Sequence, residues 1–446
     1  MTTARYPPGP RGHWLLGNLP EFRRDMLGFY ARLARDYGDV VSYRLGPRRL
    51  VMLAHPDAIE EVLVGQNRDF EKPYIYQFLR PLLGNGLLLS EGDFWLRQRK
   101  LMQPAFLKQR VDAYGPAMVE EVQRLTAGWR AGETRDIHAD MMQFALAVAA
   151  RTLLDVDVMD EAPGVGAALE CVMADFSARF ESVLPLPRWL PLPAHRRFRT
   201  ALANLDRVVT RIIQERRSSS RPHADVLSLL MAARDEDGGG MDDRQLRDEV
   251  MTLFLAGHET TANGLTWTLY LLAKHPEVGE KLRAEATAVL AGRAPGVADL
   301  PRLPYAEWTI LEAMRLYPPV YAISRRAVRD CTVMGFDIPP ETTLLLPQCV
   351  LHRDARFFPD PEPFRPERWA DGLTKRLPRY AYFPFGGGPR VCIGNTFGML
   401  EMTLALTVLA SRFRFTLAAD HPVTPWPSIT LRPKHGVRAV IHSAGA

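Results

Sequence analysis

Apolar positions recur at the spacing of an amphipathic helix through most of the chain, whereas strict alternation of apolar and polar residues is confined to short stretches. Before about residue 94 the two patterns are mixed, and beyond it the helical pattern dominates. Helical patterns cover 27–37, 56–64, 117–129, 141–154, 167–180, 200–217, 246–272, 276–290, 305–317 and 392–412. Short strands are predicted at 40–45, 49–54, 333–337 and 342–347, and again after residue 413. The chain is therefore predicted to be mainly α with a minor β part.

The chain of 446 residues, 47% of them hydrophobic, is large enough to bury a sizeable core. No repeat or low-complexity tract interrupts it, and the segment DEDGGGM at 235–241 is more typical of a loop between two helices than of a domain linker. We predict one domain over 1–446. Its β-rich lobe is expected to combine the first ~90 residues with the C-terminal strands, and most of the rest is expected to form a helical lobe.

Charge and cysteine content exclude several classes of protein. The 56 basic and 51 acidic residues give a net charge of +5, without the dense basic block that binds nucleic acid. None of the four cysteines lies in a CxxC pair, so a zinc site is not expected, and free thiols are favoured over disulfides. The N-terminus lacks the ~20 apolar residues that cross a bilayer. We expect a cytoplasmic monomer without a membrane span.

The segment 383–397, FPFGGGPRVCIGNTF, has the features that a thiolate metal ligand requires. Glycines such as Gly394 let the backbone approach closely, and Cys392 stands where a loop meets a helix, which favours the anionic sulfur. Arg390 offers a forked donor to an anionic cofactor, and Phe385 can limit access of water to the sulfur. The alternative for an isolated cysteine is a buried structural thiol, but the combination of features favours a ligand.

A second segment, LFLAGHETTANG at 253–264, places polar groups within an apolar helix. Glu259 and Thr260 are costly to bury without partners, and Ala256 removes side-chain bulk so that a small molecule can lie against the helix. The alternative is a surface turn of an amphipathic helix, in which the same residues only cap the helix and contact solvent.

Together these segments resemble the haem-binding and oxygen-activating motifs of the cytochrome P-450 superfamily, and the resemblance extends over most of the chain. It implies the P-450 fold, with haem b held between the oxygen-activating helix and the cysteine-loop helix and with the sulfur of Cys392 as the iron ligand. It further implies that Glu259 relays protons from solvent and that Thr260 orients water during oxygen activation.

The resemblance also assigns residues outside the two motifs. Glu312 and Arg315, three apart on one helix face, and Arg368 in FRPERW match the family's structural network, although such a pair alone is typical of an exposed ion pair. Trp95 and Arg99 match the positions that face the haem propionates, with a surface helix carrying a packed tryptophan as the alternative.

Substrate and electron supply follow from the same resemblance. The segments expected to contact substrate are mostly apolar and include Phe254, Val320, Tyr321, Ile323 and Ile429. They favour a lipophilic substrate such as a terpene or a fatty acyl chain. No flavin or iron–sulfur segment is present, so the two electrons that accompany O2 are expected from a ferredoxin and its reductase. A basic docking surface for the donor is predicted at Arg97, Lys100, Arg110, Lys375, Arg376 and Arg379.

Two other functions remain open at this point. A haem-thiolate isomerase or dehydratase would rearrange a peroxide without external electrons, and a haem sensor would bind a ligand without turnover. The paired acid and alcohol at 259 and 260 favour the monooxygenase.

Overall fold

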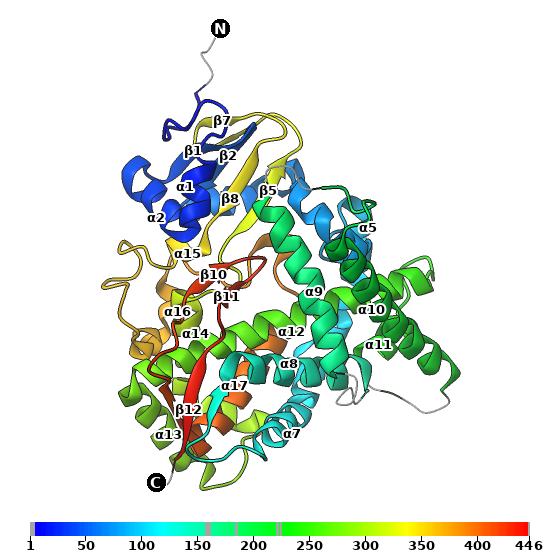
Figure 1. The fold of residues 1–446 in the computed structure, drawn as a ribbon, viewed down its shortest axis with the longest axis vertical. Coiled ribbons are helices and arrows are strands. Elements are labelled where there is room, and N and C mark those ends of the chain that lie inside the picture. Colours follow the sequence, from blue (N-terminus) through cyan, green and yellow to red (C-terminus); the bar gives the residue numbers. More distant parts are fainter. Residues whose placement is uncertain (1–4, 157–161, 183–185, 220–222, 224, 445–446) are drawn as a thin grey trace. The chain divides into compact units, whose positions relative to one another are not determined.

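In the computed structural model, which describes residues 5–156, 162–182, 186–219, 223 and 225–444, contacts divide the chain into two units. Unit 1 comprises Met1–Tyr76 and Leu311–Cys392, and unit 2 comprises Gln77–Ile310 and Ile393–Ala446 (Figure 1). With 57% helix and 12% strand, the predicted mainly α composition is confirmed. The prediction of a single domain stays a prediction.

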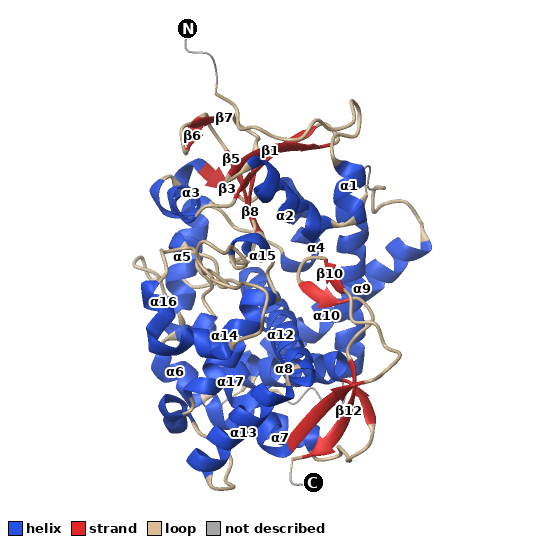
Figure 2. Cartoon of the chain, turned by 90° about the vertical axis from the view of Figure 1, so that its left-hand side faces the viewer, coloured by secondary structure: helices blue, strands red, loops and turns tan. Residues whose placement is uncertain are grey.

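Unit 1 is built on a five-stranded sheet in the order β1-β2-β8-β5-β3 (Figure 2). The strands are β1 (Val40–Leu45), β2 (Arg48–Leu53), β8 (Thr343–Leu346), β5 (Ile323–Ala327) and β3 (Phe70–Glu71). All neighbouring pairs are antiparallel except β2 and β8, which run parallel. Gly46 allows the tight turn between β1 and β2 because it adopts a φ of 60°.

Short helices complete unit 1. They are α1 (Leu19–Arg24), α2 (Met26–Tyr37), α3 (Pro56–Glu60), α15 (Gln348–Leu351) and α16 (Leu373–Arg376). The predicted helix 56–64 is divided, because α3 continues as a π-helical turn over Glu61–Gly65. The predicted strand 333–337 is wrong: β6 (Cys331–Val333) and β7 (Phe336–Ile338) form a hairpin there. Met334 and Gly335 make its turn with positive φ angles, which the apolar alternation did not indicate.

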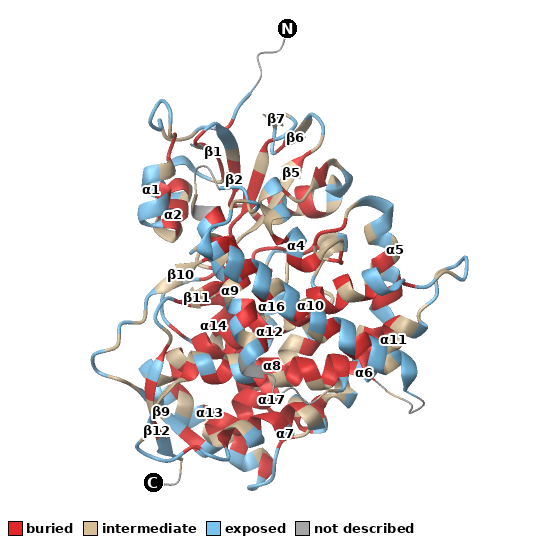
Figure 3. Cartoon of the chain, turned by 45° about the vertical axis from the view of Figure 1, so that its right-hand side comes forward, coloured by how far each residue is buried: buried red, intermediate tan, exposed pale blue. Residues whose placement is uncertain are grey.

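Unit 2 is a set of helices arranged around α12 (Asp243–Lys274), a helix of 32 residues. The helices α8 (Ile137–Leu154), α10 (Pro193–Ser218) and α17 (Asn395–Arg412) contact α12, and most of the residues of α8 and α17 are buried (Figure 3). The remaining helices of this unit are α4 (Arg80–Leu83), α5 (Gly92–Met102), α6 (Lys108–Ala113), α7 (Gly115–Thr126), α9 (Ala162–Glu181), α11 (Val226–Ala232) and α13 (Pro276–Leu290). Helix α14 (Pro304–Leu316) continues from unit 2 into unit 1.

Helix boundaries differ from the predicted ones mainly at N-termini. Helix α12 begins at Asp243 because the side chain of Asp242 accepts the backbone N–H of Gln245, a capping interaction that precedes the apolar run. The segment 235–241 is a loop between α11 and α12, as predicted.

The C-terminal strands belong to unit 2, which differs from the expected β-rich lobe. Strands β9 (Phe413–Leu417) and β12 (Arg438–Ser443) pair with each other, and β12 also pairs with β4 (Thr134–Asp136), directly before α8. Strands β10 (Pro425–Pro427) and β11 (Leu431–Pro433) form a separate hairpin. This placement follows from chain continuity, since β9 begins where α17 ends and β4 ends where α8 begins. Among the described residues, no helix is both long enough and apolar enough to cross a membrane.

Candidate functional site

Cys392 ends a glycine-rich loop whose backbone is fixed by its own hydrogen bonds. The N–H of Cys392 donates to the carbonyl of Phe385 at 2.9 Å, and the N–H of Val391 donates to that of Gly388 at 3.1 Å. Gly386 and Gly388 have φ angles of 72° and 64°, which other residues rarely adopt. The loop therefore turns back on itself and holds Cys392 in an exposed position.

The same loop packs so closely against other segments of unit 1 that Gly387 and Gly388 cannot be replaced by residues with a side chain. A Cβ atom at Gly388 would lie 1.9 Å from the carbonyl oxygen of Leu63, and one at Gly387 would lie 2.1 Å from the ring of Tyr380. The N–H of Gly388 also donates to the hydroxyl of Tyr380 at 3.1 Å. Tyr380, which the sequence analysis did not single out, therefore helps to fix the loop.

Exposure distinguishes Cys392 from the other three cysteines and agrees with its predicted role as a ligand. Cys392 is exposed, whereas Cys171, Cys331 and Cys349 are at least partly buried. Burial raises the pKa of Cys331 to about 11 and that of Cys349 to about 12, so both remain neutral thiols at neutral pH. An accessible sulfur on a fixed loop fits the thiolate that a haem iron requires.

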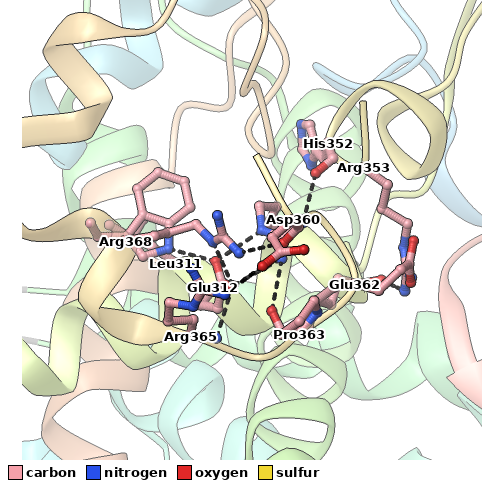
Figure 4. A network of polar contacts seen from close by, with 12 residues as sticks. Leu311, Glu312, His352, Arg353, Asp360, Glu362, Pro363, Arg365 and Arg368 are labelled. Atoms are coloured by element: carbon pink, nitrogen blue, oxygen red, sulfur yellow. Dashed lines mark hydrogen bonds and ion pairs between the residues drawn. The ribbon is translucent and has the colours of Figure 1, made fainter. Parts of the chain in front are cut away.

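Glu312, itself fully buried, is the centre of a polar network that supports this loop (Figure 4). Arg315 donates two hydrogen bonds of 2.9 Å to its carboxylate. Arg368 and the indole of Trp369 each donate one more, also at 2.9 Å, and the backbone N–H of Arg365 donates at 3.1 Å. The structure thus brings together the three residues of the predicted network, and neither Glu312 nor Arg315 is the exposed ion pair of the alternative.

His352 connects this network to the cysteine loop. Arg315 donates to the carbonyl of His352 at 3.0 Å, and the ring Nε2 of His352 accepts the backbone N–H of Phe383 at 3.0 Å. Burial and the charge of Arg315 lower the pKa of His352 to about 3, which keeps the imidazole neutral and able to accept. Tyr382 adds a bond of 2.8 Å from its hydroxyl to the carbonyl of Leu311. Neither His352 nor Tyr382 stands in a recognisable motif, so the sequence analysis missed both.

Helix α12 has one open face in its middle. From Asp248 to Leu269 every residue is buried except Ala256, Gly257 and Thr260, which share one side of the helix. The hydroxyl of Thr260 donates to the carbonyl of Ala256 at 2.6 Å. The absence of any side chain larger than threonine on this face fits a flat cofactor or a small molecule lying against it.

Glu259 lies on a different face of α12 and is only 3% exposed. The hydroxyl of Thr430 donates to its carboxylate at 2.5 Å, and Arg432 forms an ion pair with it at 3.0 Å. The structure therefore does not bring the carboxylate of Glu259 to the hydroxyl of Thr260. Thr430 and Arg432, on the β10–β11 hairpin and its tip, were missed as partners because sequence alone cannot show which segment covers the helix.

A second carboxyl group, Glu401 on α17, is buried against α12. Burial raises its pKa well above the usual value, although a hydrogen bond with Thr261 acts in the opposite direction. Burial therefore favours the neutral form of Glu401. The apolar pattern of α17 concealed it.

The cofactor residues predicted on other elements have definite positions. Trp95 and Arg99 lie one turn apart on α5, both partly buried. Arg390 is partly buried in the turn that precedes Cys392, and Gly394 directly precedes α17. The structure leaves their role as haem contacts a prediction.

Three cations of the predicted donor surface are already paired. Arg97 forms an ion pair with Asp235 at 2.6 Å, and Lys100 forms one with Glu236 at 2.9 Å. Arg379 pairs with Glu60 at 2.9 Å. These acidic partners neutralise part of the expected positive charge.

The predicted substrate residues divide into two groups. Phe254 is buried against Leu153, Val226 and Leu230, away from the open face of α12. Tyr321 is also buried in unit 1, near Tyr43 and Cys349. We therefore do not assign substrate contacts to Phe254 or Tyr321.

Val320, Ile323 and Ile429 are partly exposed. The side chain of Ile323 lies beside Gly386 of the cysteine loop. Ile429 stands between two anchored neighbours, because Ser428 bonds to Ser177 on α9 and Thr430 bonds to Glu259. These three residues remain candidates for an apolar substrate surface.

Comparisons with known proteins agree with this geometry. Residues 7–437 match the family model described as cytochrome P450. The chain is 38% identical over 432 residues to cyclooctatin synthase of Streptomyces melanosporofaciens, covering 96% of this chain and 94% of the relative. It is 35% identical over 413 residues to pentalenene oxygenase of Streptomyces avermitilis, covering 92% and 91%. Among solved structures, a retinoic-acid-bound cyanobacterial CYP120A1 superposes with a TM-score of 0.88 at 28% identity, covering 99% of this chain and 100% of that chain.

Removing the charge of Glu312 is expected to destabilise the protein by about 3–5 kcal/mol, because Glu312→Gln leaves two buried guanidinium groups without their carboxylate. Urea unfolding of the purified variant measures this loss. Glu307→Gln, at an exposed position of the same helix, is the matched control and should change stability by less than about 0.5 kcal/mol. A Glu312→Gln protein as stable as the control would contradict the role given to the network.

Acidification is expected to destabilise the protein through His352. Its pKa is about 3 in the folded state and about 6.5 when unfolded, so the unfolded state binds the proton more readily between these values. Stability should therefore fall as pH is lowered from 7 to 5, by ~2 kcal/mol from this group alone. Urea unfolding at both pH values should show a smaller change in His352→Gln and an unaltered change in His435→Gln, where the histidine is exposed. Equal pH dependence in all three proteins would refute the assignment.

Proposed function

Since the chain belongs to the cytochrome P450 family, we propose that it is a haem-dependent monooxygenase that hydroxylates a terpene scaffold. The observation that carries the proposal is the exposed thiol of Cys392 on a loop fixed by Tyr380 and, through His352, by the buried network around Glu312. Haem b, when bound, supplies the oxygen activation and the attack on a C–H bond.

In this proposal the residues of the cysteine loop hold the cofactor. Cys392 would supply an anionic sulfur to the iron, Phe385 would limit water at the sulfur, and Gly394 would let the backbone come close. Arg390, and by family resemblance Arg99 and Trp95, would donate hydrogen bonds to the propionates. The small side chain of Ala256 would leave room for a ligand beside helix α12.

Thr260 and Glu259 have different proposed roles, the first in orienting water and the second in proton transfer. The hydroxyl hydrogen of Thr260 is committed to the carbonyl of Ala256, so its oxygen is oriented to accept a hydrogen bond from water on the open face. Glu259 is held by Thr430 and Arg432, and must exchange one of these partners for water when it moves a proton.

The proposed substrate is an apolar terpene skeleton. Val320, Ile323 and Ile429 offer aliphatic surface, which binds hydrocarbon without orienting hydrogen bonds. Cyclooctatin synthase and pentalenene oxygenase, to which the chain is similar, are terpene-modifying enzymes. We propose that this chain acts on the same chemical class.

Electrons are proposed to come from a ferredoxin and its reductase in the cytoplasm, with the chain acting as a monomer. Monooxygenases of this family take O2 and electrons from redox partners. Because Arg97, Lys100 and Arg379 are paired with acids, Arg110, Lys375 and Arg376 are the better candidates for contacts with an acidic donor.

The purified protein is expected to bind haem and to change the spin state of its iron when a terpene hydrocarbon is added, because the substrate displaces water. The reduced carbon-monoxide adduct should show a thiolate-type Soret band, and turnover under ¹⁸O2 should place one labelled oxygen in the product. Cys392→Ser should lose the thiolate-type band, whereas Cys171→Ser should keep it. A histidine-type band in the wild type, or spin-state shifts only with charged sugars, would refute the proposal.

Replacing the hydroxyl of Thr260 with an isosteric methyl group should lower the yield of product per electron pair by roughly tenfold or more, because proton delivery fails and hydrogen peroxide escapes. Thr266→Val on the same helix is the matched control, since Thr266 makes the same backward bond to a carbonyl but is fully buried. Product and peroxide are measured together during turnover. Tight coupling in Thr260→Val would rule out the role of the hydroxyl.

A further inference from the structure

A group of polar side chains is buried in unit 2 next to Glu259. We call His138, His258, Asn263 and Arg432 the histidine cluster. His138 lies in the first turn of α8, His258 and Asn263 lie on α12, and Arg432 lies on β11. His258 and Asn263 lie in the segment 253–264 but have no assigned role in the proposed function, and His138 and Arg432 lie outside the two motifs.

In each member of the cluster, one buried polar atom makes no hydrogen bond of good geometry among the described residues, although the side chains of His138 and Asn263 interact with each other. These atoms are Nε2 of His138, Nδ1 of His258, Oδ1 of Asn263 and Nε of Arg432. Buried polar groups are normally satisfied by protein or by ordered water, and leaving several together unsatisfied is costly. A small polar region with several such partners is the environment that holds internal water.

The cluster is directly connected to Glu259. Arg432 forms the ion pair of 3.0 Å with its carboxylate. Asn263 donates to the hydroxyl of Thr430 at 3.1 Å, and that hydroxyl donates to Glu259 at 2.5 Å. Asn263 and Arg432 are therefore linked to the acid through one hydroxyl or directly, and the charge of Arg432 acts on both His138 and His258.

The two imidazoles suit a water chain because both are neutral at neutral pH. Burial and the nearby charge of Arg432 lower the pKa of His138 and of His258 to about 4. A neutral imidazole has one donor nitrogen and one acceptor nitrogen, so it can bind water in either orientation. His258 also interacts with the backbone of Met142, which fixes its ring.

The other end of the cluster reaches the surface. His138 is partly exposed as a residue although its Nε2 is buried, and Thr134 and Ala139 near it are exposed. His138 thus lies between the exposed residues at the start of α8 and the interior of unit 2.

We propose that the histidine cluster holds a chain of water molecules that carries protons from the surface at α8 to Glu259. Inserting one atom of O2 into a C–H bond consumes two electrons and two protons and forms one water, so protons must reach the site in every turnover. The electrons are those of the redox donors, and the protons come from solvent. The four side chains are positioning residues that act through water, and the inference rests on the proposed role of Glu259.

The test compares apolar and polar replacements of the histidines in the holoenzyme. His138→Leu and His258→Leu remove the groups that bind water, so the yield of hydrogen peroxide and the solvent deuterium isotope effect on product formation should each rise at least twofold. His138→Gln and His258→Gln keep a donor and an acceptor and should restore both values. His195→Leu is the matched control, because His195 is buried like His258 but bonds to Arg179 and to the carbonyl of Leu190.

A second measurement does not depend on turnover or on the folding of the leucine variants. A high-resolution structure of the wild-type holoenzyme should show ordered water bound to Nε2 of His138 and Nδ1 of His258. Absence of water there, or leucine variants with the coupling and isotope effect of the wild type, would overturn the inference.

The variant Glu259→Gln distinguishes a failure of the proposed role of Glu259 from a failure of the proposed water chain. If this variant is as well coupled as the wild type, the proposed role of Glu259 itself fails. If Glu259→Gln is uncoupled and both leucine variants are not, the water route alone is refuted.

Discussion

The cysteine loop depends on the hydrogen bonds that the carboxylate of Glu312 accepts. This carboxylate is fully buried, and an isolated charge in that environment would be strongly unfavourable. Five donors from Arg315, Arg368, Trp369 and the backbone of Arg365 satisfy it. Because these donors come from segments far apart in the sequence, satisfying one charge also fixes the path of the chain around it.

The network around Glu312 is connected to the cysteine loop through His352, whose imidazole and carbonyl are neutral. Arg315 also donates to the carbonyl of His352, and the ring of His352 accepts the backbone N–H of Phe383. A histidine that became protonated would lose this acceptor, so the low pKa of His352 is part of what holds the loop. Tight contacts at Gly388 add to this support of the loop that carries Cys392.

Two faces of α12 carry different groups of functional interest. Ala256, Gly257 and Thr260 leave one face open. Glu259, Asn263 and Trp267, each four residues apart, form a polar seam against residues 430–432 of the β10–β11 hairpin. The hairpin that carries Ile429 is therefore attached to the helix through the same acid that is proposed to move protons. The proposed substrate contact at Ile429 and the proposed proton transfer by Glu259 therefore both depend on the attachment of this hairpin to α12.

The sequence by itself determined the family, the mainly α composition and most helices, and it singled out Cys392 as the proposed ligand, because periodicity and short motifs are local properties of the chain. The glycines around Cys392 and the spacing of Glu312 and Arg315 are local in the same sense. Tertiary structure alone decided the partners of the polar residues. Glu259 faces Arg432 rather than Thr260, Phe254 turns into the core, and His352 joins a network with no motif, because each depends on which distant segment covers it. Strand pairing was hidden for the same reason, since hydrogen bonds between β12 and β4 join residues some 300 positions apart.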